Sequence, residues 1–339
     1  MFRLTSVHDR LVSGALGLGL TSAVMMFGFG VSSSAVATPA DEVAVFAQCP
    51  LDTPGGVDGC LVLRGEGGEI TIGKLRVPIV NTQVMQGGFI NSEETGAMSL
   101  VGAANGETFP RTPQRVPDGT VQCDNTRGSK WFGRRGHRRW FERGERGLCR
   151  AIFENKHAGL YITPELAAPV SSIILDENAA FSEQGTAISL PVKFKLENPL
   201  LGDDCYIGSD TNPIVIELTD GTSGSLTGKI GQITTRDEAR ILIITASTFV
   251  DNTFAAPAAT DCGYGGRLDS FINTKLGLPA PAGTNAEILI GTHEQAGARL
   301  VRESEESSTT PSSTPPPPHG EPGATSQPSP TEPSISIRG

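Results

Sequence analysis

The chain contains few aromatic residues, and this scarcity bears on carbohydrate binding. Phe, Trp and Tyr make up 6% of the sequence, with only two Trp and three Tyr. A protein that stacks sugar rings along an extended cleft needs aromatic side chains to line it. The composition therefore does not favour a long polysaccharide-binding cleft.

Several motifs of catalytic and cofactor-binding proteins are also absent. No G-x-G-x-x-G or P-loop pattern occurs between a strand-like and a helix-like segment, so we predict no nucleotide cofactor and no other cofactor. The G-x-S-x-G elbow of many hydrolases is missing as well, because its nearest match, residues 221–225, ends in Ser225.

Histidine is scarce, which restricts the choice of a general base. The four histidines beyond the N-terminal region are His137, His157, His293 and His319. His137 lies in a basic segment and His319 in a Pro-rich tail, which leaves His157 and His293 for a buried dyad with a nucleophile. A secreted hydrolase with an unrecognised active site therefore remains the alternative to a non-catalytic function.

Only one long uncharged run occurs, and it lies at the N-terminus. Residues 11–31 carry no charge, follow Arg3 and Arg10, and precede an A-x-A sequence that ends at Ala37. This arrangement predicts a signal peptide at residues 1–37 and a secreted protein, with cell-wall association as an option. An uncleaved membrane anchor is the alternative, since the run is long enough to span a bilayer. No second apolar span follows, so we expect no stable transmembrane segment after cleavage.

Zinc-binding patterns are missing although the chain has six cysteines. No C-x-x-C pair occurs, and no histidine lies at ligand spacing from a cysteine. The acidic loop at residues 202–212 matches no EF-hand spacing, and Asx turns explain its residues equally well, so we predict no metal. An even number of cysteines in an exported chain indicates disulfides, for which six allow fifteen pairings. We predict the sequential pairs Cys49–Cys60, Cys123–Cys149 and Cys205–Cys262.

The C-terminal segment has almost no large apolar residues. Residues 303–339 contain nine Pro, nine Ser and five Thr. Such a segment cannot bury enough apolar surface to offset its ordering entropy, so we predict a disordered tail. Residues 38–302 are then the secreted folded domain.

Helical signals are scarce in that domain, whereas strand signals are frequent. Apolar residues alternate along residues 188–196 and again along residues 214–218. Residues 70–79 alternate with a change of phase at Gly73-Lys74, which predicts a hairpin with a two-residue loop. Residues 240–245 read as a central buried strand, and residues 269–276 are the best helix candidate. We predict a mainly β domain with few short helices, folded as an antiparallel sandwich or a barrel-like sheet and stapled by disulfides.

Three stretches together resemble a known group of proteins. They are QGGFINSEETGAMSLVGAANGETF at residues 86–109, LPVKFKLENPLLGDDCYIGSDTNPIVIELTDG at residues 190–221, and FAAPAATDCGYGGRLDSFINTKLGLPAPAGTNAEILIG at residues 254–291. The phrases resemble a group of exported actinobacterial proteins with no known activity, over most of residues 46–302. The resemblance implies one extracellular unit and brings no cofactor or catalytic residue.

The sequence departs from that group in a basic segment at residues 127–150, which is more apolar in the group. The segment has nine Lys or Arg against two Glu, a net charge of +7 in a chain of net charge −10. Arginine pairs with phosphate and carboxylate, while tryptophan anchors at lipid headgroups, so the segment is a candidate for binding an anionic wall polymer or a phospholipid surface. The candidate residues are Lys130, Trp131, Arg134, Arg135, Arg138, Arg139, Trp140 and Arg143.

A less specific interpretation of the basic segment stays open. It could be an exposed insert, closed by a Cys123–Cys149 disulfide, that neutralises the acidic body or aids solubility. Its five glycines argue against a rigid recognition helix. The sequence as a whole predicts a non-catalytic exported protein of the cell envelope or extracellular space, with a binding or structural role.

Overall fold

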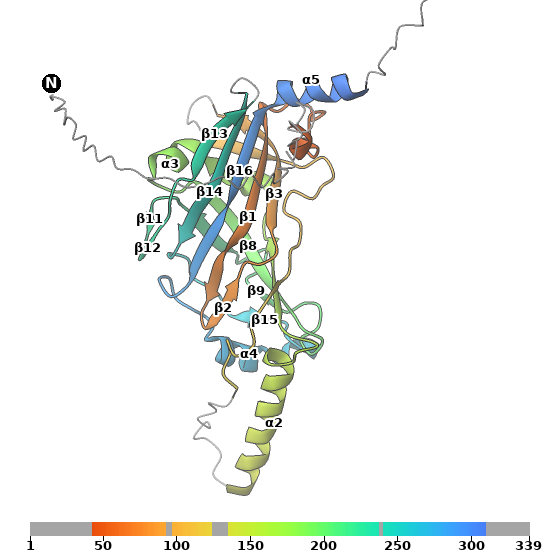
Figure 1. Cartoon of the computed structure of the whole chain (residues 1–339). Helices are drawn as coiled ribbons and strands as arrows, with labels where there is room; N and C mark the ends of the chain where they lie inside the picture. The colour runs from red at the N-terminus through yellow and green to blue at the C-terminus, as the bar shows by residue number, and fades with distance from the viewer. Residues whose placement is uncertain (1–42, 93–96, 124–134, 237–239, 310–339) are drawn as a thin grey trace, which may run out of the picture. The chain divides into compact units, whose positions relative to one another are not determined.

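The computed structural model describes residues 43–92, 97–123, 135–236 and 240–309, and it shows a mainly β domain (Figure 1). Among the described residues strands hold 42% and helices 18%, which confirms the predicted fold class. The predicted signal peptide at residues 1–37 lies outside the described residues.

The strands form one long antiparallel sheet and a small two-stranded one. The strands are β1 (Gly59–Ile72), β2 (Leu75–Pro78), β3 (Gln83–Asn91), β4 (Ala97–Gly102), β5 (Gln114–Arg115), β6 (Tyr161–Leu166), β7 (Ile174–Asp176), β8 (Ile188–Glu197), β9 (Tyr206–Ile207), β10 (Ile214–Leu218), β11 (Thr222–Ser223), β12 (Leu226–Thr227), β13 (Gln232–Arg236), β14 (Ile241–Asp251), β15 (Ala259–Thr260) and β16 (Ala286–Gly297). The helices are η1 (Ala44–Phe46), α2 (Arg135–Phe153), η2 (Val170–Ser172), α3 (Glu177–Ser182), η3 (Tyr264–Gly266), α4 (Asp269–Leu276) and α5 (Ala298–Thr309).

The large sheet curls so that strands far apart in its order come close together. Its strand order is β13-β14-β16-β1-β3-β4-β7-β8-β6-β5, with β10 paired to β8. One bridge joins the residue after β10 to β14, because Thr219 and Val250 exchange both backbone hydrogen bonds, at 3.0 and 2.8 Å. The sheet does not close into a barrel. Strands β14, β16 and β1 thereby face strands β8 and β10 across an interior.

The main core fills this interior, and a smaller core lies on the outside of β1. Leu61 of β1 belongs to the main core, whereas its neighbours Cys60 and Val62 pack in a second cluster with Phe46 of η1 and Val301 of α5. The first four residues of β1, Gly59 to Val62, are therefore buried on both faces.

The predicted hairpin and helix are both confirmed. Ile72 pairs with Leu75, and Ile70 with Val77, across the two-residue loop between β1 and β2. Helix α4 covers Asp269–Leu276 as predicted, and Gly277 ends it in the left-handed conformation at φ 72°.

Pro191 lies inside a strand that has neighbours on both sides, which differs from the edge or bulge position that proline favours. It faces Val215 of β10. On its other side β7 pairs only as far as Ser189, and β6 begins at Val192. Pro191 therefore lies between the end of the β7 pairing and the start of the β6 pairing. No neighbouring strand needs an N–H donor at this position.

All three predicted disulfides are confirmed, with Cα–Cα distances of 5.4 Å for Cys49–Cys60, 5.6 Å for Cys123–Cys149 and 4.2 Å for Cys205–Cys262. Three disulfides are typical of a protein that works in an oxidising environment. No helix among the described residues is both long and apolar enough to cross a membrane.

The helical content exceeds the prediction in two places. Helix α2 has 19 residues and is longer than the short helices that were expected. Helix α5 extends to Thr309 and includes the first residues of the predicted tail. Residues 310–339 lie outside the described part of the chain.

Candidate functional site

The candidate residues of the basic segment fall partly on helix α2. Lys130, Trp131 and Arg134 lie outside the described residues. The backbone of the other five belongs to α2, and these residues are Arg135, Arg138, Arg139, Trp140 and Arg143. The glycine content therefore does not prevent a helix here, contrary to the sequence-based expectation.

The C-terminal end of α2 is fixed to the domain. The Cys123–Cys149 disulfide holds it, and Ile152 and Phe153 are buried in the main core. The buried Asn198 side chain donates hydrogen bonds to the carbonyl groups of Ile152 and Ala158, at 3.3 and 2.6 Å. The residues just before this anchor, 144–147, are exposed. The spacing of Leu148, Cys149, Ile152 and Phe153 is that of one helix face, and this signal could have predicted the helix.

A separate feature, the interior cavity, has no counterpart among the sequence predictions. We use this name for two adjoining spaces between the facing layers of the sheet, with volumes of about 50 and 20 Å³. Their walls share Leu63 of β1, Ile188 of β8 and Phe249 of β14. Sites for drug-sized ligands are larger, at about 300–1,000 Å³, but they too are lined by apolar side chains with a few polar groups.

Two glycines help to create the larger space. Gly65 of β1 and Gly291 of β16 are paired directly and both line the cavity. A Cβ atom on Gly65 would lie 2.3 Å from Cδ1 of Leu289, so a larger residue cannot stand there unless Leu289 moves. Glycine inside a strand often marks such a close approach.

Strand β16 carries polar groups on the face that lines the cavity. Glu287 and Leu289 line the larger space and His293 the smaller one, and by the alternation of a strand Gln295 shares this face. Glu287 is 7% exposed. Within the described part of the chain, Oε2 of Glu287 has no hydrogen-bond partner, whereas the side chains of His293 and Gln295 bond to each other. Glu177 of α3 also lines the smaller space, and its Oε1 is likewise without a partner.

The environment of Glu287 favours its neutral form. Glu287 lies directly opposite Asp251 in the β14–β16 pair. The Asp251 carboxylate is fully buried and accepts hydrogen bonds from the backbone N–H groups of Glu217 and Thr253 and from the hydroxyl groups of Ser223 and Thr253. Burial, and secondarily the charge of Asp251, raises the pKa of Glu287 from 4.5 to about 8. Glu287 is therefore an uncharged hydrogen-bonding group at neutral pH.

His293 is also neutral at the other end of the cavity. Burial lowers its pKa from 6.5 to about 4, and the neighbouring Gln295 offsets only part of this shift. His157, the other candidate base, is exposed. A catalytic dyad needs a nucleophile within hydrogen-bond reach of its base, and Nε2 of His293 has no such partner.

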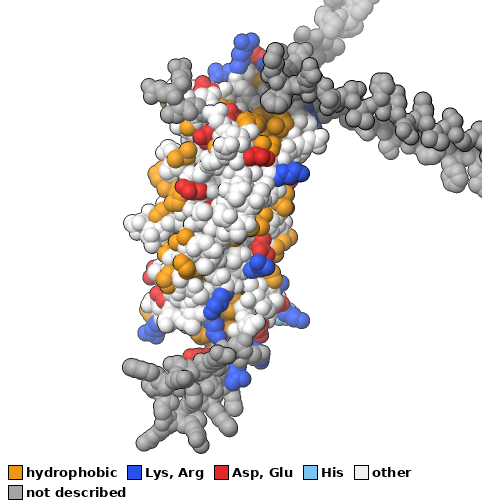
Figure 2. Space-filling model, turned by 90° about the vertical axis from the view of Figure 1, so that its left-hand side faces the viewer, with side chains coloured by type: hydrophobic (Ala, Val, Ile, Leu, Met, Phe, Trp, Pro, Cys, Tyr) orange, Lys and Arg blue, Asp and Glu red, His pale blue; other side chains and the backbone are white. Residues whose placement is uncertain are grey.

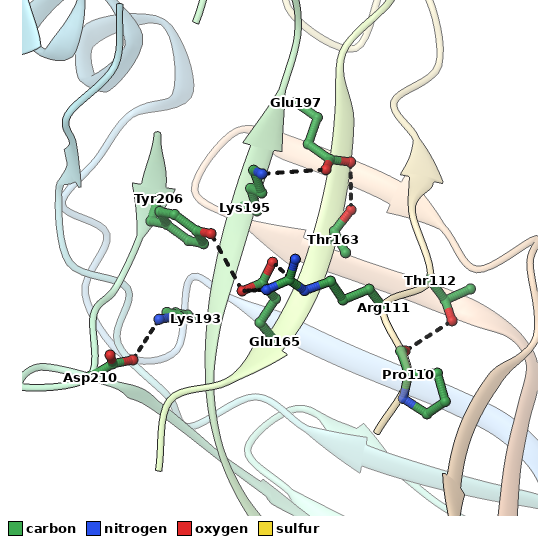
Figure 3. A network of polar contacts seen from close by, with 10 residues as sticks. All are labelled: Pro110, Arg111, Thr112, Thr163, Glu165, Lys193, Lys195, Glu197, Tyr206 and Asp210. Carbon is green, nitrogen blue, oxygen red and sulfur yellow. Dashed lines mark hydrogen bonds and ion pairs between the residues drawn. The ribbon is translucent and has the colours of Figure 1, made fainter. Parts of the chain in front are cut away.

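A charged cluster lies on strands β6, β8 and β9 and was not predicted from the sequence (Figure 3). Nε of Arg111 lies 3.1 Å from Oε1 of Glu165, and Nζ of Lys193 lies 2.6 Å from Oδ1 of Asp210. Three cations face three anions, so their formal charges cancel. The cluster is made of Arg111, Lys193, Lys195, Glu165, Glu197 and Asp210, together with Thr163 and Tyr206.

Tyr206 of this cluster has a raised pKa. Burial and the nearby Glu165 carboxylate raise the pKa of its hydroxyl above the usual value of 10.0. The hydroxyl lies 3.4 Å from Oε2 of Glu165, and Nζ of Lys193 lies 5.1 Å from the centre of the ring. A tyrosine held protonated in this way is a hydrogen-bond donor and not a nucleophile.

The charged cluster is connected to the interior cavity through one loop. Arg111 belongs to the segment between β4 and β5, and Phe109, two residues earlier, lines the larger space. The backbone of this segment is also bonded to β3, because the backbone N–H of Gln86 donates to Thr108 O at 2.9 Å. The Arg111–Glu165 ion pair therefore helps to hold Phe109 in the cavity wall.

On the face seen in Figure 2, the described surface has no patch in which all charged side chains have the same sign. There, basic and acidic side chains are scattered among uncharged ones, and hydrophobic side chains form small separate groups. Such a mixture of side chains is ordinary for the solvent-exposed surface of a folded protein.

Comparison with known proteins adds no relative to this description: no family model, no curated protein and no solved structure matches the chain. The functional argument therefore depends on the geometry of the domain, and the likeness to exported actinobacterial proteins stays a prediction.

Proposed function

We propose that this protein is exported and acts without catalysis, holding a small and largely apolar molecule in its interior cavity. The observation that carries the proposal is the cavity itself, since its walls are mostly apolar and still contain buried polar atoms without partners. Buried polar groups are normally hydrogen-bonded, and unpaired ones in a concave site are explained by a ligand or by water. The three disulfides and the predicted signal peptide support an extracellular location.

Filling the cavity should abolish binding of an apolar probe. Leu289 lines the larger space, whereas its neighbour Ile290 is 41% exposed. We expect the protein of residues 38–339 to bind xenon saturably, because small apolar cavities take up this atom, and Leu289→Trp to weaken that binding at least tenfold. Ile290→Trp is the matched control, because it adds the same ring on the outer face of the same strand. Titration with xenon followed by NMR measures all three affinities.

Two results would contradict the cavity proposal. One is wild-type protein that shows no saturable binding of xenon. The other is a Leu289→Trp variant that keeps its fold, as judged by circular dichroism, and binds xenon as tightly as the Ile290→Trp control.

A second candidate function is contact with an anionic polymer or lipid surface through the basic segment. The observation that favours it is helix α2, whose sequence carries six arginines and whose C-terminal end is anchored by the Cys123–Cys149 disulfide. A cationic helix fixed at one end can meet phosphate-bearing surfaces without a change in the domain. The hydrolase alternative has no comparable observation in its favour.

Retention on an anionic surface tests this second function. Replacing Arg134, Arg135, Arg138 and Arg139 with alanine should abolish salt-sensitive retention on phosphatidylglycerol vesicles and on anionic wall polymer, because such attraction is electrostatic and screened by salt. The same four positions changed to lysine should keep most of it. Unchanged retention in the alanine variant, or its complete loss in the lysine variant, would argue against charge-driven binding.

A further inference from the structure

Strand β13 is an edge strand without the usual protection of an exposed edge. It ends the strand order of the large sheet and, among the described residues, pairs only with β14. Its five residues, QITTR, are all exposed, and their register with β14 runs without a bulge. Natural sheets protect such an edge with proline, lysine, a bulge or a covering segment, because its outward N–H and C=O groups can pair with another strand. Residues 232–236 contain no proline and no lysine, so this edge can accept a further strand.

The opposite end of the strand order shows the protection that β13 lacks. Strand β5 has only two residues, and Pro113 and Pro117 flank it closely on either side. Short length and proline are both devices that prevent pairing at an edge. The open edge is therefore a particular property of β13 and not of both ends of the sheet.

Ile233 places an apolar side chain beside this open edge. It is 48% exposed, although Ile244, which lies opposite it on β14, is buried. Thr235 shares the face of Ile233, because side chains two residues apart in a strand point the same way. A strand added outside β13 covers Ile233 when it brings apolar residues to this face, and such cross-strand pairs stabilise a sheet.

The last residues of the predicted tail have the sequence that this edge requires. Residues 334–338 read SISIR, an alternation of polar and β-branched apolar residues that is typical of a strand. Ile335 and Ile337 are also the only large apolar residues in the sequence after Thr309. They are two residues apart, as are Ile233 and Thr235.

The tail begins close enough to β13 for these residues to reach it. Arg240, just after β13, forms an ion pair with Glu303 of α5 at 2.9 Å, and Figure 1 shows β13 and α5 at the same end of the domain. Thr309 lies ~9 Å further along α5 than Glu303, at the rise of a helix. Residues 310–333 follow, and a linker of this length spans roughly 25–30 Å on average.

We infer that residues 334–338 add to the outer edge of β13 as an antiparallel strand. Ile337 then lies opposite Ile233. Two residues away, Ile335 lies opposite Thr235. Main-chain hydrogen bonds hold the added strand, and its isoleucines cover the exposed apolar position of β13. The pairing also covers an edge at which two copies of the chain could otherwise associate.

The arginines of the two segments favour the antiparallel direction. In this register Arg338 lies opposite Gln232, and Arg236 lies opposite Ser334, so the two positive charges are at opposite ends of the pair. A parallel strand that brought the isoleucines to the same face would place Arg338 beside Arg236. Like charges on directly neighbouring positions destabilise a sheet.

Hydrogen exchange of the β13 amides, followed by NMR, tests this pairing. The protein of residues 38–339 is compared with the Ile335→Gly/Ile337→Gly variant, and Ile335→Val/Ile337→Val is the matched control because valine keeps the β-branched shape. We expect the β13 amides that face away from β14 to exchange about fivefold faster in the glycine variant than in the wild type and the valine control. The amides of β14 report in each case that the domain stays folded.

The same measurement identifies a different occupant of the edge. Equal exchange rates in the wild type and the glycine variant overturn the inference. Protection that rises with protein concentration overturns it as well, because it assigns the edge to a second copy of the chain. Protection that is independent of concentration and is lost only in the glycine variant supports pairing within one chain.

Discussion

Replacing Cys205 and Cys262 together with alanine should lower the free energy of unfolding by about 4 kcal/mol. Their disulfide joins residues 57 positions apart, the longest separation of the three. A cross-link restricts the unfolded chain, and in the chain-entropy description its effect grows with the length of the closed loop. Both cysteines are also fully buried, so their removal leaves space in the main core.

The structure shows which elements would separate in that variant. Cys205 immediately precedes β9, and Cys262 follows β15, which pairs with β9. The backbone at Cys205 accepts a hydrogen bond from Leu196 of β8, at 2.8 Å. The disulfide therefore fastens β15, and through it α4, to the layer formed by β8 and β9.

Urea unfolding followed by circular dichroism measures this loss, and a second disulfide supplies the control. Cys49 and Cys60 are only 11 positions apart, so their double alanine variant should lose less, about 3 kcal/mol. If the Cys205/Cys262 variant is no less stable than the Cys49/Cys60 variant, the argument from loop length is wrong for this domain.

The disulfides and many strands could be predicted because their signals are local. Alternating apolar residues predicted the positions of β8 and β10, and the phase change at Gly73 predicted the β1–β2 hairpin. Strand order could not be derived in this way. Strand β1 pairs with β16, so that Gly59 faces Gly297, and no short sequence pattern links residues so far apart.

The interior cavity was missed because strand β16 reverses the usual pattern. Its most regular apolar alternation, Ile288 and Ile290, lies on the outer face, and Ile290 is 41% exposed. The inner face instead mixes Glu287, Leu289 and His293. Periodicity alone assigns the apolar side to the core. Buried ionisable residues break that rule, and such local conflicts are expected at functional sites.

The charge state of the cavity leads to the second prediction with a large expected effect. Between pH 6.5 and pH 8 the free energy of unfolding of the wild type should fall. The Glu287→Gln substitution should remove this fall. The pKa of Glu287 is raised on folding, from 4.5 to about 8, so its contribution is fully present below 4.5 and is lost as the pH rises to about 8. Over the interval from 6.5 to 8 the loss is about 2 kcal/mol, since each pH unit corresponds to about 1.4 kcal/mol.

Two other groups with shifted pKa values act at lower pH. Burial lowers the pKa of His293 from 6.5 to about 4, so its contribution is present above 6.5 and is lost as the pH falls. Burial raises the pKa of Asp220 from 3.8 to about 6, so its contribution is already lost at pH 6. Of these three groups Glu287 has by far the largest effect on the stability between pH 6.5 and 8.

Urea midpoints at pH 6.5 and pH 8 test this assignment, with Asp220→Asn as the control variant. The wild type and Asp220→Asn should both lose stability between the two pH values, whereas Glu287→Gln should stay nearly constant. A Glu287→Gln variant that loses as much as the wild type would show that Glu287 is ionised in the folded protein. In that case the interior cavity would carry a negative charge at neutral pH, and burial would not be the dominant influence on this carboxyl group.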